Sequence, residues 1–235
     1  GNTGSVSSLT NLVSSTGVVA TDTAGVGTAR DALAAAGYGT DKAIFGYGTN
    51  TGGSAGTVSM TNLVSNSGVV ATDTTGVGTA RLAPAAAGYG TDKAIFGYGE
   101  NSSLPVSMTN LVSNAGVVAT DTTGVGTARL YLSAAKYGTD KALFGYGWNN
   151  ATNYSMTNLV SNTGVVSTDT TGVGTVRRFL AATGYGTDKA IFGYGFDGII
   201  AFSLTNLVSN TGVVSTDTTG VGTVRGGPAA ATYGS

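Results

Sequence analysis

Apolar residues in this chain come in short runs, and glycine, threonine, asparagine and serine separate the runs. No segment shows the 3.6-residue apolar spacing of an amphipathic helix, and glycine interrupts every window of helical length. The stretch 92–139 is typical, with runs at 93–98, 106–113, 117–121 and 128–137. Turn-forming residues bound each run, which is characteristic of strands. The pattern therefore predicts an all-β chain built from units of four short strands.

The connections and faces of these strands can also be predicted. Residues 114–116 (Asn-Ala-Gly) are expected to form a hairpin turn, and residues 123–126 (Thr-Gly-Val-Gly) a glycine-supported turn or bulge. In the strand at 94–98, strict alternation would place Ala94, Phe96 and Tyr98 on one face. The other face, with Ile95 and Gly97, would be slim enough for neighbouring units to nest.

The pattern repeats along the whole chain. The phrase Thr-Asn-Leu-Val-Ser begins at Thr10, Thr61, Thr109, Thr157 and Thr205. Each copy continues to an arginine and a Tyr-Gly pair, but the segment Asp-Lys-Ala-Ile/Leu-Phe-Gly-Tyr-Gly occurs only at Asp41, Asp92, Asp140 and Asp188. The repeats are therefore 1–40, 41–91, 92–139, 140–187 and 188–235, and the first lacks its opening strand.

A period near 48 residues with four strands matches one blade of a β-propeller. We expect a single domain over 1–235, a five-bladed β-propeller built from five near-identical repeats. The alternative is a β-solenoid, in which the repeats stack linearly and leave exposed ends. The absent strand would lie between the two termini of a closed ring. An incomplete blade of this kind can accept a strand from another chain, so homo-oligomerisation stays open.

Composition excludes several functions. The chain has no Cys and no His, which rules out disulfides, Cys/His zinc sites and a histidine base. A net charge of -1 provides no basic surface for nucleic acid, and the longest purely apolar stretch, 199–202, is too short for a membrane helix. No glycine-rich segment completes a nucleotide motif, and no calcium loop is present, so we expect no cofactor or metal. The sequence offers no candidate catalytic base for a nucleophile, and nothing marks Glu100 and Asp197 as a catalytic carboxylate pair. We therefore expect that the protein is not an enzyme.

The residues from Arg81 through 85–89 to 95–99 are similar in layout to the kelch type of propeller repeat, although Gly-Tyr-Gly replaces the usual glycine pair. The phrases Thr-Asp-Lys-Ala-Ile-Phe-Gly-Tyr-Gly and Ser-Met-Thr-Asn-Leu-Val-Ser-Asn-Thr-Gly-Val-Val resemble repeat-bearing structural proteins of marine bacteriophages. The resemblance covers nearly the whole chain. It implies a virion or extracellular, host-contact setting and no particular activity.

Two windows differ among the repeats. The first follows Phe-Gly-Tyr-Gly and covers 49–57, 100–105, 148–154 and 196–202; the second follows the arginine and covers 31–32, 82–84, 130–132, 178–179 and 226–228. These connections lie two strands apart in each four-stranded meander. Because such connections emerge on the same side, both windows are expected to form one face of the molecule.

Six aromatic residues do not recur between repeats, and all lie in or beside these windows: Tyr131, Trp148, Tyr154, Phe179, Phe196 and Phe202. Asn149, Asn150, Asn153 and Asp197 lie next to them and could supply hydrogen bonds. Exposed aromatic rings suit stacking on sugars or anchoring a protein, so the sequence predicts a non-enzymatic face that binds a glycan or a protein surface. The alternative is that these rings only fill gaps between blades, in a purely structural or designed symmetric scaffold without a ligand.

Each repeat also carries an aspartate eight residues before its arginine: Asp22 and Arg30, Asp73 and Arg81, Asp121 and Arg129, Asp169 and Arg177, and Asp217 and Arg225. We interpret them as structural ion pairs that join strands or neighbouring blades. The functional alternative is a ring of carboxylates or guanidiniums that holds an ion on the axis.

Overall fold

The computed structural model describes residues 5–102 and 104–232, and it is all-β, as predicted. Four antiparallel three-stranded sheets make up its regular part. They are β1 (Ala34–Tyr38), β2 (Lys42–Gly46) and β3 (Thr61–Val64); β4 (Ala85–Tyr89), β5 (Lys93–Gly97) and β8 (Thr109–Val112); β9 (Ser133–Tyr137), β10 (Lys141–Trp148) and β11 (Asn153–Val160); and β12 (Ala181–Tyr185), β13 (Lys189–Gly193) and β14 (Thr205–Val208). A small hairpin, β6 (Glu100–Asn101) and β7 (Leu104–Pro105), and a 3-10 turn at Ser54–Gly56 complete it. No helix in the described ranges is long and apolar enough to cross a membrane.

Each sheet spans a boundary between two sequence repeats. The second sheet takes β4 from the end of repeat 41–91, and takes β5 and β8 from repeat 92–139. The central strand β5 pairs on both sides, with Phe96 opposite Ala86 on β4 and Asn110 on β8. The end of each of the first four repeats is therefore tied to the start of the next by a strand ladder.

The predicted third strand of each unit, 117–121 in the repeat 92–139, is only partly formed. Two isolated bridges join this segment to the sheet: Val112 with Val118, and Thr109 with Thr122, one residue beyond the predicted strand. The predicted hairpin turn at 114–116 is confirmed, with Gly116 at φ 80°. The run 128–137 is interrupted, because Tyr131 at φ 54° separates Leu130 from β9.

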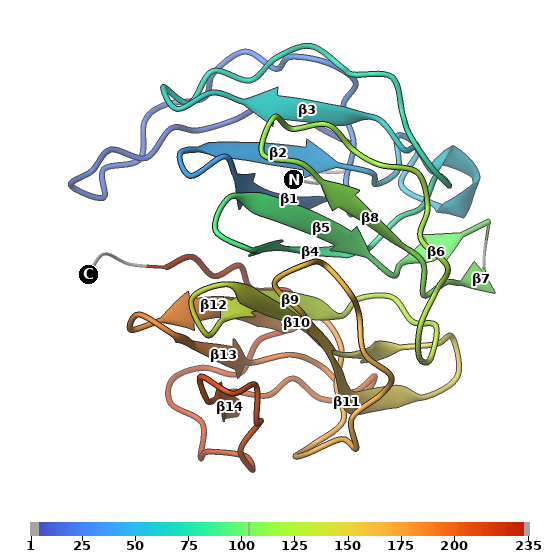
Figure 1. Cartoon of the computed structure of the whole chain (residues 1–235), viewed down its shortest axis with the longest axis vertical. Coiled ribbons are helices and arrows are strands. Elements are labelled where there is room, and N and C mark those ends of the chain that lie inside the picture. Colours follow the sequence, from blue (N-terminus) through green and yellow to red (C-terminus); the bar gives the residue numbers. More distant parts are fainter. Residues whose placement is uncertain (1–4, 103, 233–235) are drawn as a thin grey trace.

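The sheets pack in chain order through their first strands. β1 packs on β4, β4 on β9, and β9 on β12. In Figure 1 these strands lie towards the middle of the molecule, whereas β3 lies near the top and β11 and β14 near the bottom. Thr232, near the end of the described chain, contacts Thr183 on β12, with 3.2 Å between the two Oγ1 atoms. Tyr233, which belongs to the fifth Tyr-Gly pair, lies outside the described residues.

Neighbouring sheets nest by placing a phenylalanine ring against a glycine. The Phe96 ring of the second sheet lies over Gly46 of the first, with its Cζ 2.8 Å from the position of a Cβ on that glycine. Phe96, Phe144 and Phe192 are all 0% exposed. The prediction that a bulky face nests on a slim one is therefore confirmed for this position.

The expected position of Tyr98 is wrong. It does not share a face with Phe96, because its ring packs edge-on against Phe144 of the following sheet, with 5.1 Å between the ring centroids. Its backbone lies at φ 63°, which interrupts the alternation of side chains that an extended strand would give. Burial raises the pKa of Tyr98 to about 12.

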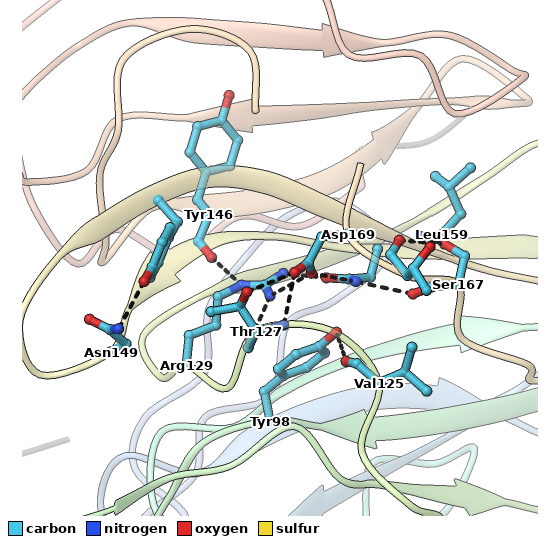
Figure 2. A network of polar contacts seen from close by, with 12 residues as sticks. Tyr98, Val125, Thr127, Arg129, Tyr146, Asn149, Leu159, Ser167 and Asp169 are labelled. Atoms are coloured by element: carbon cyan, nitrogen blue, oxygen red, sulfur yellow. Dashed lines mark hydrogen bonds and ion pairs between the residues drawn. The ribbon is translucent and has the colours of Figure 1, made fainter. Parts of the chain in front are cut away.

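A buried arginine lies at each junction between complete sheets, and Figure 2 shows the contacts of Arg129. Its guanidinium carbon lies 4.5 Å from the ring centroid of Tyr98 in the preceding sheet. Its Nε donates a hydrogen bond to the Tyr146 carbonyl at 2.7 Å, and its Nη1 donates one to the Thr127 carbonyl at 2.9 Å. A buried cation needs such partners because an unpaired charge is costly to desolvate.

The same guanidinium also contacts the following sheet. Arg129 Nη2 donates to Asn158 Oδ1 at 2.5 Å, and Asn158 Nδ2 in turn donates to Asp169 Oδ1 at 2.9 Å. Asp169 Oδ2 accepts hydrogen bonds from the backbone N and the hydroxyl of Thr127. Burial acts to raise the pKa of Asp169, but the hydrogen bonds from Thr127 and Asn158 outweigh it and hold the pKa below its ordinary value. We call this arrangement of arginine, asparagine and aspartate the arginine clamp.

The predicted pairing of aspartate and arginine eight residues apart is wrong. Each arginine instead pairs with the aspartate of the next repeat: Arg30 with Asp73 at 3.9 Å, Arg81 with Asp121 at 3.8 Å, Arg129 with Asp169 at 3.6 Å, and Arg177 with Asp217 at 3.6 Å. The cause is that the arginine lies on the connection that crosses to the next sheet. In residues 5–102 and 104–232, Asp22 and Arg225 have no ion-pair partner. The clamps join neighbouring sheets and do not form an ion site on an axis.

Candidate functional site

The two variable windows meet in the structure, as the strand order predicts. Backbone bridges join Asp31 to Thr49, Leu82 to Glu100, Leu130 to Trp148, and Arg178 to Phe196. Each bridge connects the residue after the arginine to the residue after Phe-Gly-Tyr-Gly. We call the surface formed by the two windows the variable face.

A ladder of backbone hydrogen bonds runs through one position of the variable face in all five repeats. Ala83 N donates to Ala32 O, Tyr131 N to Ala83 O, Phe179 N to Tyr131 O, and Gly227 N to Phe179 O, over 2.7–3.4 Å. The first four residues have φ between 48° and 54°, and Gly227 has φ 70°. Left-handed backbone is unfavourable for alanine and aromatic residues, so the ladder must hold it in place.

The ladder borders a hollow of about 360 Å³. All five repeats contribute to its wall: Ala32, Leu33, Ala83, Pro84, Tyr131, Leu132, Phe179, Leu180 and Gly227. Its volume lies at the small end of the range for small-molecule sites. Apolar side chains predominate, which suits a ligand with an apolar face.

The aromatic residues beside the hollow form a cluster around Arg178. Tyr131 and Phe179 pack with their ring centroids 4.1 Å apart. The Arg178 guanidinium carbon lies 4.3 Å from the Trp148 ring and 5.7 Å from the Phe196 ring. All four aromatic rings are partly exposed, so they keep accessible surface while also packing on one another.

Other predicted residues shape loops at the edge of the cluster. Asn149 Nδ2 donates to the Tyr154 hydroxyl at 2.8 Å, and Asn153 Nδ2 donates to the Asp197 carbonyl. The Asp197 carboxylate accepts backbone hydrogen bonds from residues 199 and 200, which lower its pKa. Phe202 is half-buried, and its backbone N donates to Gly195 O at 2.8 Å. These residues hold the loops in place and do not line the hollow.

Glu100 links loops from different repeats. It is 8% exposed, and its carboxylate accepts hydrogen bonds from Ser54 Oγ at 2.5 Å and Asn150 Nδ2 at 3.0 Å. Burial raises the pKa of Tyr131; the negative charge of Glu100 adds to this increase, and Arg178 opposes it. Asp31 also raises this pKa, so charged groups from three repeats act on one ring at the hollow.

Sequence reasoning missed Arg178 and the linking role of Glu100. A signal was available, because most charges in the chain recur in four or five of the repeats, and five charges occur only once: Asp31, Glu100, Lys136, Arg178 and Asp197. All of these except Lys136 lie in the variable windows. Charges that break the repeat therefore mark the same face as the unique aromatic residues.

No group of three or more acidic residues in the described ranges could hold a metal ion. No family model matches the chain, and no curated protein matches it significantly. Half-buried aromatic rings border an apolar hollow, and the Glu100 carboxylate and the Arg178 guanidinium lie on the loops near these rings. This arrangement is suited to binding a ligand. A function for the chain must therefore be argued from this geometry.

Proposed function

We propose that this chain is a non-enzymatic, five-bladed β-propeller whose variable face binds a glycan at the hollow. The observation that carries the proposal is the hollow itself, which has wall residues from all five repeats and a pair of partly exposed aromatic rings. Sugars present flat apolar faces edged by hydroxyls, and aromatic rings beside charged groups complement both features.

Contacts between the repeats support a closed ring. Residues from the first and last repeats, Ala32 and Gly227, line the same hollow, and the backbone ladder connects them through the three repeats between. β12 does not pack comparably on β1 within the described ranges, and Thr232 occupies the next position after β12. In this proposal the described end of the chain, at 229–232, fills the position between β12 and β1.

In this proposal a sugar ring stacks on Tyr131 or Phe179, and Arg178 donates hydrogen bonds to its hydroxyls. Glu100 and Asn150 keep the surrounding loops in one arrangement, which reduces the entropy lost on binding. The proposal is for binding only: the carboxylates of Glu100 and Asp197 hold neighbouring loop groups through hydrogen bonds, and neither residue lines the hollow. The resemblance of the repeats to phage structural proteins is the basis for proposing a virion or host-contact role.

A protein surface is the second candidate ligand. Leu104, Ile199 and Ile200 are 70%, 87% and 55% exposed, and all lie in the variable windows. Exposed branched side chains suit a protein partner better than a sugar.

A glycan array tests the proposal. We would compare the parent chain with a double variant, Tyr131→Asn and Phe179→Asn, because asparagine tolerates positive φ while removing both rings. A control variant, Val117→Asn, replaces a 65% exposed apolar residue away from the windows. We expect the parent and the control to bind the same glycans and the double variant to lose them. If the folded parent chain binds no glycan on the array, the proposal is contradicted. A protein partner, or a scaffold without a ligand, would then be favoured.

A further inference from the structure

A second cleft, of about 480 Å³, lies beside the first hairpin of the chain. Its lining includes Leu9, Thr10 and Asn11 from that hairpin, and Arg30, Phe45 and Asn62 from the first sheet and its connection. Because the rest of the chain repeats this region, the later copies show what normally fills the same position.

Phe45 is the exception in the series of nested phenylalanines. Phe96, Phe144 and Phe192 each pack on a glycine of the preceding sheet and are 0% exposed. Phe45 is only partly buried, and within the described ranges no glycine of a preceding central strand lies against it. Gly46 packs against the Phe96 ring, but no described residue takes the equivalent place against the Phe45 ring.

Arg30 is the exception among the buried arginines. A tyrosine ring lies over each of Arg81, Arg129 and Arg177, at 4.1–4.7 Å. Arg30 is 3% exposed, but no described ring lies over it, and its Nη1 has no hydrogen-bond partner, whereas the Nη1 of each of the other three donates to a backbone carbonyl. A buried cation without these contacts is a site where a further group would be stabilising.

The hairpin also leaves one strand edge open. Residues 10–13 pair with 19–23 through the bridges of Thr10 with Thr23 and Val13 with Val19. The equivalent strand β8 pairs with β5 along its other edge, but no described strand pairs with that edge of 10–13. Val13 is consequently 64% exposed, whereas its counterpart Val112 is 0% exposed. Open edges of this kind are templates for strand addition.

We propose that this cleft binds one extended strand of the type Asp-Lys-Ala-Ile-Phe-Gly-Tyr-Gly, the sequence that fills the equivalent position in the later sheets. The register follows that of β5 and β8, with the strand's phenylalanine opposite Asn11 and its first glycine opposite Thr10. That glycine lies against the Phe45 ring, and the tyrosine lies over the Arg30 guanidinium. The tyrosine hydroxyl reaches the Val26 carbonyl, as the Tyr47 hydroxyl reaches the Val77 carbonyl at 3.3 Å. Strand hydrogen bonds provide affinity, and the glycine and tyrosine positions provide specificity.

The test uses the full chain and a labelled peptide, Gly-Thr-Asp-Lys-Ala-Ile-Phe-Gly-Tyr-Gly, which is the sequence of residues 90–99. Fluorescence anisotropy measures binding, and circular dichroism confirms that the chain is folded. We expect saturable binding with one peptide per chain. A peptide with Gly97→Val should bind about tenfold more weakly or worse, because the added side chain meets the Phe45 ring.

The Phe45→Ala chain provides a matched comparison. Removing this ring should reduce the difference between the glycine and valine peptides, because the steric conflict is gone. Absence of binding by a folded chain would overturn the proposal, as would equal binding of both peptides to the parent.

Discussion

The Cζ atom of Phe144 lies 2.7 Å from the position that a Cβ on Gly97 would occupy. This contact joins the second and third sheets, and the same contact recurs between Phe96 and Gly46 and between Phe192 and Gly145. Glycine is required at these positions by the close approach of a ring and not by backbone conformation. The spacing between sheets is therefore set by side chains that the repeat keeps unchanged.

We predict that Gly97→Ala destabilises the chain by about 1–3 kcal/mol, because the new methyl group meets a buried ring. Gly193→Ala is the matched control, since its nearest atom is Thr205 Cγ2 at 3.5 Å. The control should be neutral or slightly stabilising through the unfolded state. Urea denaturation measures both, and equal effects would contradict the nesting of rings on glycines.

Removing a nested ring should be costlier. We expect Phe144→Ala to lower the free energy of unfolding by about 3–5 kcal/mol, because the ring is 0% exposed. Phe45→Ala should cost much less, since Phe45 is only partly buried. A loss below about 1 kcal/mol for Phe144→Ala in denaturant titration would show that the ring is not packed as described.

Much of this fold could be predicted from sequence, because local patterns determine it. The short runs, the turn at 114–116 and the meeting of the variable windows follow from residue type and strand order alone. The face of Tyr98 could not be predicted, since its positive φ breaks the alternation on which the prediction depended. The partner of Arg129 was also missed, because sequence proximity favoured Asp121 whereas the crossing connection brings Asp169 close.

The arginine clamp should contribute strongly to stability. Arg129→Met removes the cation but leaves Asn158 and Asp169 without their partner, so we expect a loss of about 3 kcal/mol or more. Arg225→Met is the control, because Arg225 is exposed. Its guanidinium packs on the Tyr194 ring at 4.6 Å, and among the described residues its side chain donates one long hydrogen bond, to the Thr223 carbonyl at 3.3 Å. Thermal denaturation of the two variants should separate them clearly. Similar melting temperatures would contradict a structural role for the clamp.

The clamps also predict a dependence of stability on pH. The pKa values of Asp73, Asp121, Asp169 and Asp217 are all held below the ordinary value. A carboxyl whose pKa is lowered by folding stabilises the fold above its unfolded pKa, and this contribution is lost as the pH falls through the folded pKa. The free energy of unfolding should therefore be steady above about pH 5 and decrease below about pH 4.

An Asp121→Asn variant provides the check on this assignment. It cannot titrate at this position, so its stability should decline less steeply in acid than that of the parent. Denaturation curves collected from neutral to acid pH measure the slope. An unchanged slope would mean that the acid sensitivity arises at other carboxyls.

The candidate site was only partly predictable. Unique aromatic residues located the variable face, because departures from a repeat are visible without coordinates. The sequence could not show that Tyr131 and Phe179 border a hollow whereas Tyr154 and Phe202 shape loops. The difference depends on the positive φ of the ladder residues, which the sequence does not reveal. The role of Arg178 could not be predicted from the sequence either, because the fold brings the Trp148 ring, 30 residues earlier in the chain, and the Phe196 ring of the next repeat close to its guanidinium.

The most direct test of the central claim uses the single tryptophan of the chain as a reporter. Trp148 lies under Arg178 on the variable face, so a ligand at the hollow should change its fluorescence. We would titrate a glycan from the array into the parent, the Val117→Asn control and the Tyr131→Asn, Phe179→Asn variant. The account predicts a saturable change in emission for the first two and none for the third. Binding of the glycan without any change in Trp148 emission, or the same change in all three proteins, would contradict it.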